Sequence, residues 1–131
     1  MDELIIEAKL ENFKKVLAFV ESHTGDFPVK SRRHINIAVD EIFTNISNFA
    51  YQNKTGTVVI RIAADDAVTI EFEDNGVPYD PTAQAEPDLT QSADERTPGG
   101  LGIFMTKKLM DTVEYRREDN KNILTLKKGA L

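Results

Sequence analysis

The sequence predicts an α+β fold: a two-layer sandwich in which a mostly antiparallel sheet carries three helices on one face. Three observations lead to this prediction. Apolar residues recur at helical spacing in three segments, they alternate with polar residues in five others, and the segments follow the order β-α-α-β-β-loop-α-β-β. A chain of 131 residues is long enough to bury one core, so we expect a single domain, 1–131.

The first half of the chain predicts one strand, two helices and a hairpin. Residues 3–8 alternate as a strand, and a helix of about three turns follows until Gly25 and Pro28 end it. Ser31 is the expected N-cap of a longer helix, about 32–51. Strands at 56–63 and 67–73 then alternate cleanly around Asp65-Asp66, which predicts an antiparallel hairpin.

The second half contains a long loop before one more helix and two strands. Residues 74–99 hold four of the five prolines and show no periodicity. Loops of this length in a compact domain are usually functional, so we interpret about 79–99 as a lid. A helix over 100–111 follows, then strands near 112–118 and 122–128 joined by a turn at Asp119-Asn120-Lys121.

Composition excludes several classes of function. The chain has no cysteine and two histidines, which rules out disulfides and thiolate metal sites and makes a multi-histidine zinc site improbable. A net charge of −6 argues against a general nucleic-acid binder. No apolar run has transmembrane length and the acidic start lacks a basic leader, so we expect a cytoplasmic protein without membrane contact.

Glu41 and Asn45 form the first candidate pair. They lie four residues apart on the second predicted helix, so their side chains share one face. Asn45 can offer its carbonyl oxygen to Mg²⁺, which needs only one or two protein ligands beside substrate phosphates. Glu41 can then act as a general base. Taken alone, a solvated helix face explains the same pair.

The second candidate is Asp74-x-Gly76-x-Pro78, which closes a predicted strand. An ionised Asp74 accepts hydrogen bonds, so it would favour the exocyclic amine of adenine over the oxygen of guanine. Gly76 would let the base approach the backbone. An ordinary turn is the competing interpretation, but the loop that follows cannot be a returning strand.

The third candidate is the cluster Gly99, Gly100 and Gly102, with Leu101, at the start of the third helix. Backbone N–H groups and the positive end of that helix predict an anion site, although glycines can also merely hinge a loop. In the lid, Arg96 is the only basic residue between Arg61 and Lys107, so it is the lid candidate for a terminal phosphate.

The order of these signals resembles the N, G1 and G2 boxes of the GHKL superfamily, the ATP-binding fold of gyrase, Hsp90, histidine kinases and the mismatch-repair ATPase. The stretches AVDEIFTN, ADERTPGGLGIFMTKKLMDTVEYRRE and NILTLKK more closely resemble the anti-sigma factor serine/threonine kinases. The resemblance covers essentially the whole chain and implies a Bergerat-type fold with ATP and Mg²⁺ as cofactors. One departure is Phe49, where sporulation-type kinases tend to carry a histidine.

The resemblance also implies residue roles. Glu41 matches the general base, Asn45 the Mg²⁺ ligand and Asp74 the adenine-binding aspartate, with Gly76 beside the base. Gly100 and Gly102 match the glycines at the hinge and the triphosphate. Arg96 matches a lid residue that touches the γ-phosphate or the partner, and Thr125 matches a hydroxyl near adenine.

Two functions follow from the resemblance. The first is an ATP-dependent serine/threonine kinase that phosphorylates a small anti-sigma-antagonist (STAS-like) protein, with a sigma factor and a second copy of the chain as further partners. The alternative is a non-catalytic nucleotide-sensing module that holds or releases a partner. A histidine-kinase catalytic domain is a third reading, but no dimerising helix pair bearing a histidine accompanies it.

Overall fold

The computed structural model describes residues 1–52, 54–83 and 100–129. Its helices and strands, in chain order, are β1 (Asp2–Glu7), α1 (Phe13–Thr24), α2 (Val29–Asn45), β2 (Thr57–Ala64), β3 (Ala67–Asp74), α3 (Gly100–Leu109), β4 (Thr112–Glu118) and β5 (Lys121–Gly129). Two 3₁₀ turns (Leu10–Asn12 and Pro81–Ala83) and one π turn (Ile46–Ala50) complete the list.

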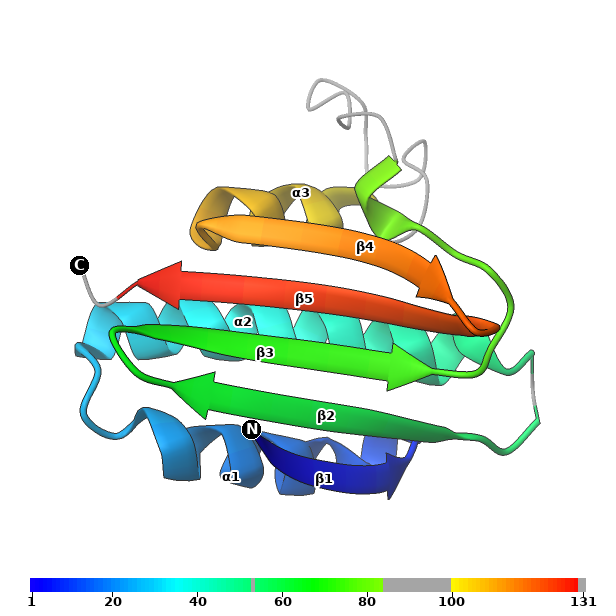
Figure 1. The fold of residues 1–131 in the computed structure, drawn as a ribbon, viewed down its shortest axis with the longest axis horizontal. Helices are drawn as coiled ribbons and strands as arrows, with labels where there is room; N and C mark the ends of the chain where they lie inside the picture. Colours follow the sequence, from blue (N-terminus) through cyan, green and yellow to red (C-terminus); the bar gives the residue numbers. More distant parts are fainter. Residues whose placement is uncertain (53, 84–99, 130–131) are drawn as a thin grey trace.

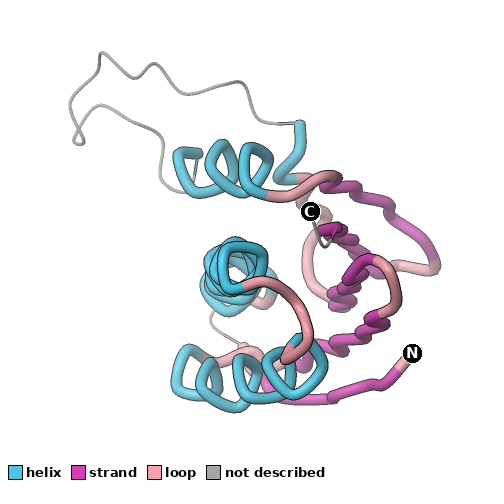
Figure 2. The backbone as a smooth tube through the Cα atoms, turned by 90° about the vertical axis from the view of Figure 1, so that its left-hand side faces the viewer, coloured by secondary structure: helices cyan, strands magenta, loops and turns pink. Residues whose placement is uncertain are grey.

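The strands form one antiparallel sheet in the order β1-β2-β3-β5-β4 (Figure 1). Figure 2 shows α1, α2 and α3, the α-helices of the described residues, on one face of that sheet. The predicted two-layer α+β fold is therefore confirmed. The order also places β3 beside β5 at the centre, with the end of β3 next to the start of β5.

The core lies between the sheet and α2. Alternation along β2 and β3 turns every second side chain inward, so Ile60, Ile70 and Phe72 are almost fully buried. They meet the apolar stripe of α2, which includes Ile35 and Val39, both with no exposed surface. Burying each such side chain stabilises the fold by about 1.5–3 kcal/mol.

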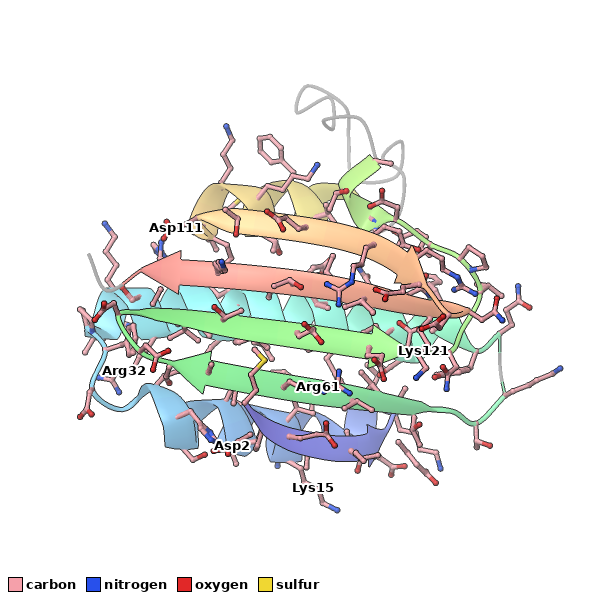
Figure 3. The ribbon with its side chains drawn as sticks, in the orientation of Figure 1. Asp2, Lys15, Arg32, Arg61, Asp111 and Lys121 are labelled. Carbon is pink, nitrogen blue, oxygen red and sulfur yellow. The ribbon has the colours of Figure 1, made fainter. Side chains whose placement is uncertain are left out.

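The outer face of the sheet is polar and is joined by ion pairs. Arg61 on β2, labelled in Figure 3, lies 2.8 Å from Glu3 on β1. It also lies 3.1 Å from Glu71 and 3.3 Å from Glu73 on β3. Three neighbouring strands are thereby held together on the side that carries no helix.

Helix α2 differs from the prediction at both ends. It begins at Val29, and Pro28 occupies the N-cap position with φ −56° and ψ 148°. Ser31 is 4% exposed inside the first turn, with its hydroxyl 3.5 Å from the Gly129 carbonyl, so its predicted role as N-cap is wrong. Proline ends the preceding connection and has no N–H to lose, which is why the helix begins there.

At its C-terminal end, α2 stops at Asn45 and continues as the π turn Ile46–Ala50 instead of running to residue 51 as one α-helix. The predicted hairpin turns are confirmed. Asp119 and Asn120 have φ of 52° and 61°, as expected for a type I′ turn between β4 and β5.

Of the predicted lid, residues 84–99 lie outside the described part of the chain. The described portion contains the 3₁₀ turn Pro81–Ala83. Within the ranges described above, no helix is long and apolar enough to cross a membrane.

Candidate functional site

The C-terminal half of α2 brings Glu41 and Asn45 together. The Asn45 side-chain amide donates to Glu41 Oε1 at 3.4 Å, one helical turn away, and Asn45 is 8% exposed. Burial raises the pKa of the Glu41 carboxyl, and the hydrogen bond from Asn45 opposes that shift. A carboxylate with a raised pKa is a stronger proton acceptor, which suits a general base.

The π turn Ile46–Ala50 that follows α2 anchors the loop after β3. The Ala50 carbonyl accepts from the Val77 N–H at 2.9 Å, which docks the loop after β3 onto the end of α2. A methyl group added to Gly76 would overlap the backbone of Ala50, so this close approach requires glycine. Single π turns inside helices are rare and frequently lie at functional sites.

Helix α3 starts against Glu41. A methyl group added to Gly102 would overlap the Glu41 carboxylate, so the Glu41 side chain can lie here only because residue 102 is glycine. The Thr106 hydroxyl donates to the Gly102 carbonyl at 2.9 Å and stabilises the same turn. Gly100 is the first residue of α3, as the sequence predicted.

Part of the predicted phosphate end lies outside the described structure. Gly99 and Arg96 fall outside the described residues, and so does the side chain of Leu101. The described part of this end therefore consists of Gly100, Gly102 and the first turn of α3, whose backbone N–H groups have no acceptor within the helix.

Asp74 is the last residue of β3 and is 5% exposed. Its Oδ1 accepts from the Asn122 amide at 2.9 Å and from the Gly76 N–H at 2.9 Å. Burial raises the pKa of this carboxyl, while Asn122, Gly76 and the positive charge of Arg117 oppose the shift. These contacts help to keep a buried carboxylate available as an acceptor.

Asn122 is the residue that sequence reasoning missed. It is 6% exposed on β5, directly across from Asp74 in the strand register. Its Nδ2 donates to Asp74 Oδ1 and to the Val77 carbonyl at 2.9 and 2.8 Å. The sequence did offer a signal: Asn122 stands two positions before the inward-facing Leu124, so strand alternation predicts that its polar side chain also faces inward.

Thr125 was predicted near adenine, and the register does not bring it to the face of the sheet that carries Asp74. Thr125 pairs with Glu71, whereas Asp74 pairs with Asn122. Side chains along a strand alternate between faces, so Thr125 lies on the outer face of the sheet and Asp74 on the inner one.

A cavity of about 40 Å³ joins Asn45 and Asp74. Its volume is a small fraction of the several hundred Å³ typical of a cofactor pocket, so the cavity is too small to hold a whole nucleotide. Phe49, the departure from the sporulation-type pattern, is in its wall. The lining residues are Ile42, Asn45, Ile46, Phe49, Ala50, Phe72, Asp74, Val77, Tyr79, Pro81, Tyr115, Asn122 and Leu124.

The site residues fit a nucleotide with a magnesium ion. The walls of the cavity are mostly apolar, as a purine requires, and Asp74 supplies one buried acceptor. The Nδ2 of Asn45 donates to Glu41, so the side-chain carbonyl oxygen of Asn45 is the atom that could bind a metal. Among the residues that the structure describes, no group of three His, Cys, Asp or Glu side chains gathers into a metal cluster, so any magnesium here would rely on phosphate oxygens and water.

Comparison with known proteins gives a family and several relatives. The profile of the family described as "Histidine kinase-like ATPase domain" matches residues 6–128. Serine-protein kinase RsbW of Bacillus cereus is 28% identical over 133 residues, covering 95% of this chain and 82% of that protein. Anti-sigma F factor of Clostridium acetobutylicum is 30% identical over 134 residues, covering 98% and 94%.

A third relative shares a shorter segment. Serine/threonine-protein kinase BtrW of Bordetella bronchiseptica is 41% identical over 59 residues, which is 45% of this chain. That alignment spans less than half of the relative, 42% of its length. These matches confirm the resemblance stated from the sequence.

Solved structures confirm the fold. The RsbU and RsbW domains of Rv1364c from Mycobacterium tuberculosis match with a TM-score of 0.63 at 16% identity, over 98% of this chain and 32% of that one. The histidine kinase domain from Erythrobacter litoralis EL346 matches with a TM-score of 0.60 at 16% identity, over 92% and 60%.

Proposed function

Because the chain belongs to the histidine kinase-like ATPase domain family, we propose that it is an Mg·ATP-dependent protein serine/threonine kinase of the anti-sigma type. One observation carries the proposal: Glu41 lies against the first turn of α3, one helical turn from Asn45, and Asn45 shares a cavity with Asp74. This arrangement supports the proposed roles of Glu41 as general base, Asn45 as metal ligand and Asp74 as adenine acceptor. The relatives named as kinases support the same conclusion.

At the base end, Asp74 accepts a hydrogen bond from the 6-amino group of adenine. The apolar walls, which include Phe72 and Leu124, exclude water from the ring. Guanine places an acceptor oxygen where adenine has its amine, so an ionised Asp74 repels it. The site therefore selects ATP over GTP.

At the phosphate end, Asn45 would hold Mg²⁺ through its carbonyl oxygen. When bound, the ion neutralises charge on the phosphate oxygens and helps to align them. The first turn of α3, beginning at Gly100, directs backbone N–H groups to the same place. Glycine at 102 keeps the space in front of Glu41 open.

The chemical step transfers the γ-phosphoryl group to a serine or threonine hydroxyl of a protein. The new bond joins the hydroxyl oxygen to the γ-phosphorus as the bond to the β–γ bridging oxygen breaks, and ADP leaves. Glu41 accepts the hydroxyl proton, a role that its burial-raised pKa favours. Positioning and charge stabilisation supply the rest of the rate enhancement.

The acceptor that we propose is a small STAS-like antagonist protein, in a partner-switching system of the cytoplasm, where ATP is available. A sigma factor and a second copy of the chain are the further partners in this proposal. Support comes from the relative named anti-sigma F factor, whose alignment spans nearly the whole of both chains.

Calorimetry and mass spectrometry test the proposal. The wild-type chain should bind Mg·ATP and Mg·ADP but not Mg·GTP, and Asp74→Asn should lose that selectivity. A co-purified partner incubated with Mg·ATP should gain one phosphoryl group, whereas Glu41→Gln should bind nucleotide yet transfer nothing. Nucleotide binding without phosphorylation of any partner would instead favour the non-catalytic switching module. Absence of all nucleotide binding would refute both.

A further inference from the structure

Asn122 is held by partners from three parts of the described chain. Its Oδ1 accepts from the Tyr115 hydroxyl at 2.6 Å, from Arg117 Nη1 at 3.1 Å and from the Tyr79 N–H at 3.3 Å. Its Nδ2 donates to Asp74 and to the Val77 carbonyl. Both N–H groups and the oxygen of the amide are thus engaged in a buried position.

This arrangement permits one orientation of the amide. A flip would place Oδ1 against the carboxylate of Asp74 and the carbonyl of Val77, which are both acceptors. The same flip would turn the NH₂ group toward three donors. The orientation is therefore determined by charge and hydrogen-bond chemistry.

The fixed amide decides which oxygen of Asp74 is free. Asn122 and the Gly76 N–H both donate to Oδ1. Within the part of the chain that the structure describes, no hydrogen bond to Oδ2 is recorded beside them, and Asp74 is in the wall of the cavity. A ligand in the cavity therefore meets Oδ2, a carboxylate acceptor with unused lone pairs.

We propose that Asn122 is a positioning residue that commits Asp74 Oδ1 to the protein and presents Oδ2 to the ligand, and that it thereby sets the preference for a 6-amino over a 6-oxo purine. This inference rests on the proposed nucleotide-binding function and assigns to Asn122 the control of its base selectivity. Asn122 acts on the base through Asp74, to which its Nδ2 donates.

Loss of Asn122 should change selectivity more than it changes affinity for purines in general. Without the amide, the buried carboxyl of Asp74 takes up a proton more readily and is free to turn. A protonated carboxyl donates to the 6-oxo group of hypoxanthine, which an ionised one repels. A purely structural role would instead weaken binding of both purines equally.

The test compares Mg·ADP with Mg·IDP by calorimetry on the full chain, because hypoxanthine replaces the 6-amino group of adenine by a 6-oxo group and carries a proton on N1. Asn122→Val and Asn122→Thr form a matched pair with nearly the same shape, and only threonine can donate to Asp74, directly or through one water. Asn12→Val, which removes a half-buried asparagine bonded to the Glu7 carbonyl at 3.0 Å, controls for a general loss of stability.

A hydrogen bond to a charged group discriminates by about 10–100-fold. We expect the wild type and Asn12→Val to prefer ADP by about 30-fold, Asn122→Thr by about 10-fold and Asn122→Val by about threefold or less. An unchanged preference in Asn122→Val, or an equal loss for ADP and IDP, would overturn the inference. If Asn122→Val does not fold, Asn122→Ala takes its place as the variant without a donor, and an unchanged ADP preference in Asn122→Ala overturns the inference.

The failure of the proposed function gives a different result. A wild-type chain that binds neither nucleotide refutes the proposed function and the inference with it. A wild-type chain that binds both equally keeps nucleotide binding but overturns the role of Asn122. Selective binding that survives in Asn122→Val refutes the inference alone.

Discussion

The substitution Gly102→Ala should separate stability from catalysis. The added methyl group would overlap the Glu41 carboxylate, which is the flexible end of a side chain, so Glu41 rotates away and the helices stay in place. Rotation to a poorer rotamer costs about 0.5–1.5 kcal/mol. Replacing glycine by alanine within a helix gains about 1 kcal/mol. The two effects nearly cancel, so the melting temperature should move by no more than about 4 °C.

Catalysis should respond far more strongly. A misplacement of about 1 Å costs about 100-fold in rate, and complete loss of a general base costs about 100- to 10,000-fold. We therefore expect Gly102→Ala to lower single-turnover phosphoryl transfer at least about 100-fold while Mg·ADP affinity changes by less than about threefold. Rapid-quench assays with a phosphorylated partner as product, together with calorimetry, measure the two quantities.

The matched control is Gly25→Ala. A methyl group there meets nothing within 4 Å, so the rate should remain that of the wild type. In the double variant Gly102→Ala/Glu41→Gln, the loss should equal that of Glu41→Gln alone, because both changes remove the same group. A wild-type rate in Gly102→Ala, or losses that add in the double variant, would refute the placement of Glu41.

Three further predictions concern stability. Burial raises the pKa of Asp74 in the folded state, so the folded chain binds the proton more tightly and stability falls as pH rises from the unfolded pKa to the folded one. In thermal melts, Asp74→Asn should therefore melt higher than the wild type at pH 7.5 and should lose the fall in stability that begins at the unfolded pKa of about 3.9. The Phe19 carbonyl and Asp2 raise the pKa of His23 in the folded state. The contribution of His23 to the free energy of unfolding is therefore fully present below the unfolded pKa of about 6.5 and is lost as pH rises through the folded value. In urea unfolding, Asp2→Asn should cost less than about 1 kcal/mol at pH 6 and almost nothing at pH 9. Phe72→Ala should cost about 3–5 kcal/mol in the same assay, because the ring is 1% exposed in the core, and a loss below about 1 kcal/mol would contradict its burial.

The strands were predictable to within about two residues because their signal is local. Alternation placed one hairpin at 56–63 and 67–73, and the structure has it at Thr57–Ala64 and Ala67–Asp74. The pair Glu41 and Asn45 was equally accessible, since helical geometry alone brings residues four apart together. The meeting of Glu41 with Gly102 needed the tertiary structure, although both residues were named from the sequence.

The misses have physical causes that one sequence does not display. Ser31 has the chemistry of a cap, but Pro28 already starts the helix and the tertiary fold buries the serine. Thr125 and Asn122 are three residues apart, and only the pairing with β3 decides which of them shares a face with Asp74. A shift of one residue in register exchanges the two faces, so propensity cannot make this choice.

The π turn after Asn45 has a further consequence for how this site can vary. Each residue of an α-helix turns the chain by about 100°. The wider turn at Ile46–Ala50 therefore changes the direction in which the Ala50 carbonyl points relative to Asn45, the proposed metal ligand. That carbonyl is the anchor of the loop carrying Gly76 and Val77. Loss of one residue from this turn would keep every side chain of the site but would rotate Asn45 relative to the loop that carries Gly76 and Val77. A comparison of the side chains alone would not reveal this defect.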